Sequence, residues 1–393
     1  MRILYVPCHE GGSSHHIPLL ALDALSRGES KEKAFLIPRL FHQFFNRNGI
    51  PFLDIDYDGS LHSEIEAYKK YRPDLVVDDW SLSTGFATSL MNVPRITIQR
   101  ISTFPGHVPV NRNHQHSISI NFNRYPDITH LGLRQPRTLS DFFESADVKV
   151  IPGIRSVELL PDRLKNDPTY VYCGPLLGGD YFVPAQETNH KNADVRKLMD
   201  FRPLQTFFDS HSGRPIVYFT FGNVAKANGA IQQCIRYLLD NRIAVVTNID
   251  AGELNPDQQR LYLKARYLPM HFVSSNVDLI IHPGSTGAYH YPILHNVQSI
   301  TIGTQRYDRE DASVRLQELG ASIHIPAVEE CEDFHERFKA AVAECLDNTG
   351  PQSESRRRAM TLLKAEIDET VSRFDYDSVL KQAVHLSKRR ARV

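Results

Sequence analysis

Two adjacent histidines near the start of the chain, His15 and His16, can carry acid–base chemistry. They follow the small residues 11–14, and segment 3–6 before that loop has the composition of a buried strand. Histidine titrates near neutral pH, so an imidazole at the carboxyl end of a strand can act as a general base. The alternative is that both residues cap, or lie exposed on, the helix that follows.

Two adjacent carboxylates, Asp78 and Asp79, offer a partner for such a base. They come directly after the apolar segment 75–77, which predicts a strand that ends at the same edge of a parallel sheet. A buried acid that orients an imidazole and stabilises its charged form is the arrangement of the serine-protease relay. Either residue can instead cap the next helix, so the two carboxylates stay open at this point.

A loop of small residues in the second half predicts an anion site. Segment 277–281 is apolar and is followed by His282 and by Gly284-Ser285-Thr286-Gly287. Such a loop exposes backbone N–H groups, and a helix that starts near residue 288 adds partial positive charge. A phosphate fits this chemistry. The alternative is an ordinary strand-to-helix turn, which also favours Gly with Ser or Thr.

Other stretches offer groups for binding a ligand. The predicted strand 216–221 ends at Gly222 and Asn223, where small residues let a ligand approach the backbone. Tyr267, which precedes a proline by two positions, can stack on a base or lie in the core. The charged loop 303–311 can hydrogen-bond a polyol.

The segment 101–130 is dense in Asn, His, Gln and Arg. It has little apolar surface to bury, so it is either a surface loop or part of a binding site. If it lines a site, Asn113 and His114 predict an acceptor that is polar and rich in hydroxyl groups.

Two series of strand-like segments, each alternating with helical ones, position these residues. The pattern predicts an α/β protein of two Rossmann-like, doubly wound domains. The first domain spans 1–178 and a linker spans 179–200. The second domain spans 201–352, and a helical segment 353–393 packs back towards the first domain. The predicted strands are 3–6, 35–37, 75–77, 96–98, 148–151, 216–221, 243–247, 271–273, 279–281, 299–302 and 322–325.

Composition excludes several classes of protein. The net charge of −1 gives no reason to expect a nucleic-acid partner, and the basic runs 356–358 and 388–392 are expected on solvated helix faces. No apolar run is long enough to span a membrane, and the first residues do not resemble a signal peptide. Five scattered cysteines suit a reducing compartment. We therefore expect a cytoplasmic protein with no metal site.

In chain order these stretches resemble the GT-B glycosyltransferases, specifically the nucleotide-sugar family that glycosylates natural products and includes the UDP-glycosyltransferases. The resemblance runs over nearly the whole chain and implies a GT-B fold, with two Rossmann-like domains facing a central cleft. The matching segments are 11–20, 73–79, 172–176, 219–222, 267–269, 282–287 and 308–320.

The resemblance implies a role for each matching residue. The family's catalytic His lies three residues before the Pro of the first helix, which gives His15 as base with His16 as alternative. Its relay Asp falls on Asp79, with Asp78 as alternative. The implied donor and acceptor residues are His282, Gly284, Ser285, Thr286 and Gly287 for the diphosphate, Gly222, Asn223, Tyr267 and His290 for the nucleoside, Asp308 and Arg309 for the donor sugar, and Asn113 and His114 for the acceptor.

The chain departs from the family pattern at three of these places. His290 stands where a Glu usually binds the ribose, Arg309 stands where Gln is usual, and Met270 ends a motif that usually ends in Gln. A cationic Arg309 would suit an anionic donor sugar, or it pairs with Glu310 or Asp311. These changes bear on the choice of nucleotide and sugar more than on the reaction.

The implied reaction is an inverting, metal-independent glycosyl transfer of hexosyltransferase type. A UDP- or TDP-sugar would be the donor and a co-substrate, with no cofactor, and a hydroxyl of a small natural product would be the acceptor. The sequence leaves a monomer and a homodimer open. It also leaves open a sugar-nucleotide epimerase, a transferase for a lipid-linked acceptor, and a GT-B helper protein without activity.

Overall fold

The computed structural model describes residues 1–9, 13–26, 31–111, 138, 140–178, 202–221, 229–265, 268–347 and 349–390. The chain divides into two compact units. The N-terminal unit comprises Met1–His107, Ser119–Phe182 and Ile367–Val393, and the C-terminal unit comprises Val108–Ile118 and Val183–Glu366. Within the described residues, every helix is too short or too polar to cross a bilayer.

The N-terminal unit is built on a six-stranded sheet with the order β2-β1-β3-β4-β5-β6, in which all pairs are parallel. The register sets Pro7 opposite Asp79 and Asp79 opposite Ile98. The loops after β1, β3 and β4 therefore leave the sheet at one edge. The strands are β1 (Arg2–Pro7), β2 (Glu32–Phe35), β3 (Leu75–Asp79), β4 (Arg95–Ile98), β5 (Val148–Ile151) and β6 (Tyr170–Tyr172).

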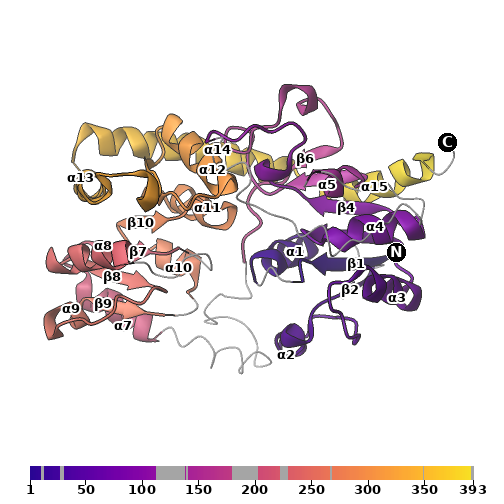
Figure 1. Cartoon of the computed structure of the whole chain (residues 1–393), viewed down its shortest axis with the longest axis horizontal. Helices are drawn as coiled ribbons and strands as arrows, with labels where there is room; N and C mark the ends of the chain where they lie inside the picture. The colour runs from indigo at the N-terminus through magenta and orange to yellow at the C-terminus, as the bar shows by residue number, and fades with distance from the viewer. Residues whose placement is uncertain are drawn as a thin grey trace. The chain divides into compact units, whose positions relative to one another are not determined.

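Helices cover both faces of this sheet, because alternate strand residues point to opposite sides. On one face, Ile3, Val77 and Ile96 pack with apolar residues of α1, α2 and α15. On the other, Leu4 and Val76 pack with α3 and α4. The helices, which can be followed in Figure 1, are α1 (Ser13–Leu25), α2 (Arg39–Arg47), α3 (Leu61–Tyr71), α4 (Leu82–Met91), α5 (Asp141–Glu144) and α15 (Tyr376–Arg390).

The C-terminal unit has a second six-stranded parallel sheet, with the order β12-β11-β10-β7-β8-β9. Apolar residues of α8 and α13 pack on one face of its strands. The strands are β7 (Ile216–Phe219), β8 (Ala244–Thr247), β9 (Tyr262–Lys264), β10 (Leu279–His282), β11 (Gln298–Ile302) and β12 (Ile323–Ile325).

The helices of this unit connect the strands in the same alternating order. The helix α14 begins among residues of the C-terminal unit, and its final turns, from Ile367, group with the N-terminal unit. The helices are α7 (Arg202–His211), α8 (Gly229–Asp240), α9 (Pro256–Arg260), α10 (Met270–Ser274), α11 (Thr286–His295), α12 (Tyr307–Glu318), α13 (Phe334–Leu346) and α14 (Pro351–Arg373).

The expected pair of Rossmann-like sheets is confirmed, with corrections in detail. Segment 271–273, predicted as a strand, lies in the short helix α10, whose N-cap position is Pro269. Three residues are too few for periodicity to separate a strand from a helical turn. Arg356, expected on a solvated face, is buried, and its Nε donates to Gln298 Oε1 at 2.7 Å. The predicted linker 179–200 lies outside the described residues.

A fully buried acid, Glu64 of α3, lies under the N-terminal sheet. The hydroxyls of Tyr68 and Thr84 donate to its Oε1 at 2.6 Å each, and Ser83 donates to Oε2. Burial raises the pKa of Glu64 to about 7, although these hydroxyl groups act against the shift. At a pH between 4.5 and about 7, the folded protein therefore binds a proton at Glu64 that the unfolded chain has lost.

We predict that Glu64→Gln removes one component of the pH dependence of stability. A carboxyl whose pKa is raised on folding stabilises fully below its unfolded pKa, and this stabilisation is lost as the pH rises to about 7. Between the two pKa values of Glu64, the free energy of unfolding of the wild type should fall by up to about 1.4 kcal/mol per pH unit because of this group. Urea unfolding of both proteins from pH 5 to 8 measures this, and a wild-type-minus-variant difference that stays constant would contradict it.

Candidate active site

His15 and Asp79 come together at the edge where β1 and β3 end. His15 lies in the first turn of α1, and its Nδ1 is 3.1 Å from Oδ1 of Asp79, the last residue of β3. The Asp79 side chain is completely buried, whereas the His15 side chain is 19% exposed. The Nδ1–H direction is not aligned on the oxygen, a geometry that catalytic pairs often show without substrate. The Nδ1 edge of the imidazole thus contacts an acid, and part of the ring reaches the surface.

Arg100, two residues after β4, binds the same carboxylate and was not predicted. Its Nη1 donates to Asp79 Oδ1 at 2.6 Å and its Nη2 to Oδ2 at 2.8 Å. Burial acts to raise the pKa of Asp79, but Arg100 and then His15 outweigh it, so the pKa lies below its usual value. Asp79 is therefore ionised. The available signal was the position of Arg100, because β4 neighbours β3 and ends at the same edge.

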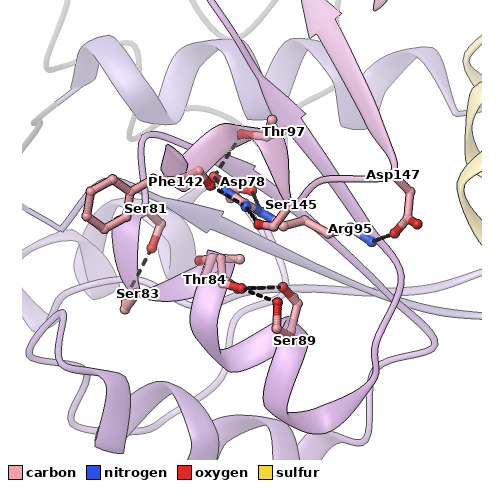
Figure 2. Close-up of polar contacts among 12 residues, drawn as sticks. Asp78, Ser81, Ser83, Thr84, Ser89, Arg95, Thr97, Phe142, Ser145 and Asp147 are labelled. Carbon is pink, nitrogen blue, oxygen red and sulfur yellow. Dashed lines mark hydrogen bonds and ion pairs between the residues drawn. The ribbon is translucent and has the colours of Figure 1, made fainter. Parts of the chain in front are cut away.

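Asp78 has a different partner on the opposite face of the sheet. Arg95 Nε donates to its Oδ1 at 2.7 Å, and Thr97 donates to its Oδ2 at 3.1 Å, as Figure 2 shows. Strand alternation explains this: Val77 and Asp79 point to the α1 side, and Asp78 points away. Both members of the Asp78–Arg95 pair are buried. The structure therefore does not bring Asp78, the alternative relay acid, to either histidine.

His16, the alternative base, is also turned away from Asp79. It is buried in the apolar layer between α1 and α2, and its ring lies against Phe41 with centroids 3.9 Å apart. Successive helix residues point about 100° apart, so only one of the two histidines can face the sheet edge. In this structure that residue is His15.

Trp80 follows Asp79 in a backbone conformation that large residues seldom adopt. Its φ is +58°, and its ring centroid lies 6.1 Å from that of His15 and 5.7 Å from that of Phe143. A positive φ at a bulky residue costs free energy and is often found at functional sites. Packing on Phe143 holds the indole beside the imidazole. Sequence reasoning did not single out this residue.

In the C-terminal unit, the predicted diphosphate loop begins at His282, the last residue of β10. Gly284 N–H donates to His282 Nδ1 at 3.1 Å, which leaves the ring proton on Nε2. Burial lowers the pKa of His282 to about 3, so the ring is neutral. Its Nε2 is buried and has no partner among the described residues. His282 therefore presents an unused N–H donor at the carboxyl end of β10.

The small residues after His282 allow a tight turn into α11. Gly284 has φ +72°, and a Cβ there would lie 1.9 Å from Ser313 Oγ and 2.8 Å from the Arg309 carbonyl. Ser285 is the N-cap residue of α11, but its hydroxyl does not cap the helix. Gly287 is exposed and has open space around it. Within the described residues, the N–H groups of Thr286 and Gly287 have no backbone partner, and the hydroxyls of Ser285 and Thr286 lie beside them, which suits an anion.

His290, predicted to contact the nucleoside, is fully buried within α11. Its Nδ1 donates to the Thr286 carbonyl at 2.7 Å, so Nε2 is an acceptor, the reverse of His282. Burial lowers the pKa of His290 to about 4. The ring is neutral and packs on Tyr289 with centroids 4.0 Å apart. In this structure His290 exposes no surface to a ligand.

The predicted sugar-binding pair lies at the start of α12. The Arg309 backbone packs under Gly284, and the Asp308 side chain lies outside the described residues. Glu310 accepts from Thr304 N–H at 3.0 Å and lies 2.9 Å from His324 Nε2, so this acid fixes the loop after β11. Also outside the described residues are Gly222, Asn223 and Tyr267 of the nucleoside set and Asn113 and His114 of the acceptor set.

Two Rossmann-like units of this topology define the GT-B class of fold, and comparisons with known proteins agree. No protein-family model matches the chain. Spinosyn forosaminyltransferase SpnP has a similar structure, with a TM-score of 0.68 at 16% identity over 98% of this chain and 99% of that chain. Spinosyn rhamnosyltransferase SpnG complexed with thymidine diphosphate has a TM-score of 0.62 at 15% identity, over 94% and 96% of the two chains.

One curated protein is similar in sequence. The 4'-demethylrebeccamycin synthase of Lentzea aerocolonigenes is 27% identical over 128 residues, which is 32% of this chain and 30% of that protein. The matched segment is thus less than a third of either chain. The resemblance to natural-product glycosyltransferases of GT-B fold, expected from the sequence, is confirmed.

We predict that Gly284→Ala destabilises the protein by about 1–3 kcal/mol, because the new Cβ meets Ser313 and backbone atoms at a positive φ. Gly287→Ala is the matched control, because nothing lies within 4 Å of its added Cβ and alanine favours the helix. Urea unfolding of both variants measures the difference. Equal stabilities would show that the Gly284 turn is not constrained as described.

Proposed function

We propose that the protein is an inverting glycosyltransferase that moves a sugar from a nucleoside diphosphate to a hydroxyl group of a small-molecule acceptor. The observation that carries the proposal is the His15–Asp79 pair, a partly exposed imidazole beside a buried, ionised carboxylate. The GT-B fold and the similarity to natural-product glycosyltransferases support it.

In the proposed reaction His15 is the general base. The carboxylate of Asp79 keeps a proton on Nδ1, so Nε2 carries the lone pair that accepts the acceptor's hydroxyl proton. The resulting alkoxide-like oxygen attacks the anomeric carbon from the side opposite the leaving diphosphate, which inverts the configuration. Asp79 then stabilises the imidazolium.

The donor diphosphate is assigned to the loop after β10 in this proposal. As the bond to the anomeric carbon breaks, negative charge grows on the departing phosphate oxygen. His282 Nε2–H, the free N–H groups at the start of α11, and the hydroxyls of Ser285 and Thr286 are donors for that charge. The nucleotide sugar is a co-substrate, and the steps assigned to these residues need no cofactor or metal.

A TDP- or UDP-sugar is the proposed donor. SpnG was solved with thymidine diphosphate, and the fold of this chain is similar to that of SpnG. His290, which stands where the family pattern has a Glu, is buried and neutral, so it adds no negative charge to this unit. The proposed acceptor is a polar small molecule or natural product.

We predict that His15→Ala and Asp79→Asn each lower kcat of sugar transfer by about 10² to 10⁴, the usual contribution of a general base. The assay follows nucleoside diphosphate release and the glycosylated product, with donor alone as a check for epimerisation or hydrolysis. His62→Ala is the control, because His62 is exposed on α3, on the other face of the sheet. Near-full activity of either site variant would reject the assignment.

We predict that His282→Leu weakens binding of TDP or UDP by about 10- to 100-fold, because a hydrogen bond from a neutral donor to a charged phosphate is lost. Isothermal titration calorimetry measures this with the nucleotide alone, and a melting curve of the free variant shows that it is folded. The acceptor KM should stay the same. An unchanged nucleotide Kd would remove His282 from the donor site.

A further inference from the structure

The fork between Arg100 and Asp79 is the feature that the proposed mechanism leaves without a role. Both guanidinium Nη atoms bind the carboxylate, and Oδ1, the oxygen nearest His15, also receives the shorter bond, of 2.6 Å. Arg100 is 14% exposed and Asp79 is 0% exposed. A bidentate guanidinium fixes both the plane and the charge of a carboxylate, which a single ammonium group cannot do.

We propose that Arg100 is a positioning residue that sets the basicity of His15 through Asp79. This inference rests on the proposed role of His15 as general base. The geometry that carries it is a series of three groups, the guanidinium, the carboxylate and the imidazole, in which the two outer groups share Oδ1.

The first consequence concerns orientation. Asp79 is the last residue of β3, and its side chain has rotational freedom about both of its bonds unless something fixes it. Arg100 reaches it from the neighbouring strand end and holds Oδ1 3.1 Å from the His15 Nδ1. The carboxylate then holds one tautomer of the imidazole, with the Nε2 lone pair available for the acceptor.

The second consequence concerns charge. An isolated buried carboxylate would attract an adjacent imidazolium strongly and favour the protonated ring. Arg100 offsets that charge, so the imidazolium faces a pair that is close to neutral. Arg100 thus weakens the attraction of Asp79 for the imidazolium, which favours the neutral imidazole that a general base requires.

The other ionisable groups near these three side chains do not reverse the effect of Arg100 on the charge that faces His15. Asp78 is next to Asp79, but Arg95 neutralises it on the opposite face. Cys173 lies near Arg100, and burial raises the pKa of its thiol, so it carries no charge at neutral pH. Within the described part of the chain, the charges that act on Asp79 most strongly are those of Arg100 and His15.

The chain supplies a matched control in the Asp78–Arg95 pair. It is also a buried Arg–Asp pair between β3 and β4, one residue away along β3, but it faces no imidazole. Thr97→Val removes one hydrogen bond from Asp78, and Arg95→Lys keeps the charge but loses the fork. Both perturb the same strands without touching the series that contains His15.

The test is the titration of His15 in the free protein, by NMR of a ¹³C-histidine-labelled sample, with His15→Gln to identify the signal. We expect Arg100→Met to raise the pKa of His15 by about one unit or more, and Arg100→Gln to do the same. Arg100→Lys should restore most of the wild-type pKa, because it restores the charge. Thr97→Val and Arg95→Lys should leave it unchanged.

Activity gives the second readout. The acid limb of kcat/KM against pH should move to higher pH in Arg100→Met, so that activity below the limb falls about tenfold. A role in folding alone would lower the melting temperature, or the rate at every pH, without moving the limb. If Arg100→Met does not fold, Arg100→Gln carries the same test.

An unchanged His15 pKa in the uncharged variants would overturn the inference, and so would an equal change in the Asp78 control variants. The outcome is separable from the proposed function. A wild-type protein that transfers no sugar would reject that function, whereas the His15 titration would still show whether Arg100 controls the imidazole.

Discussion

Asp79 is removed from water completely, and the local structure around it follows from the cost of burying a charge. Transfer of a carboxylate into a protein interior is unfavourable unless an opposite charge and hydrogen bonds replace the water. Arg100 supplies both from the adjacent strand end, and His15 lies on the remaining side. The parallel register of β1, β3 and β4 makes this arrangement possible, because it brings all three strand ends to one edge. The contacts among Arg100, Asp79 and His15 therefore depend on the register of the sheet as well as on the three side chains.

The candidate donor loop of the C-terminal unit relies on neutral hydrogen-bond donors and not on a buried pair of charges. Burial keeps His282 and His290 neutral, and their local hydrogen bonds give them opposite tautomers, one with a donor at Nε2 and the other with an acceptor. Backbone N–H groups and hydroxyls complete the loop. Neutral donors can bind an anion without an excess of positive charge, which agrees with the balanced net charge of the chain.

Much of this could be predicted from the sequence, because the signals were local. Apolar segments followed by Gly, Ser or Asp marked the strand ends, and parallel strands place those ends together. The choice of Asp79 over Asp78 was also within reach, since the period of two along β3 puts Val77 and Asp79 on one face. Arg100 was missed because its signal is the order of the strands: the adjacency of β3 and β4 brings it to Asp79. Arg356 was misjudged because Gln298, from another element, makes its burial favourable.

The histidines of the two units lie in different surroundings, and this difference affects how each unit responds to pH. Both imidazoles near the donor loop have pKa values of about 3 and 4, so neither changes its charge between pH 5 and 9. A nucleoside diphosphate keeps its two phosphoryl groups ionised over most of that range, and the loop that would hold it does not titrate. In the N-terminal unit, by contrast, a partly exposed imidazole is connected to a buried carboxylate. The proposed proton transfer takes place in the N-terminal unit, and the Arg100–Asp79 fork acts on the carboxylate that contacts His15.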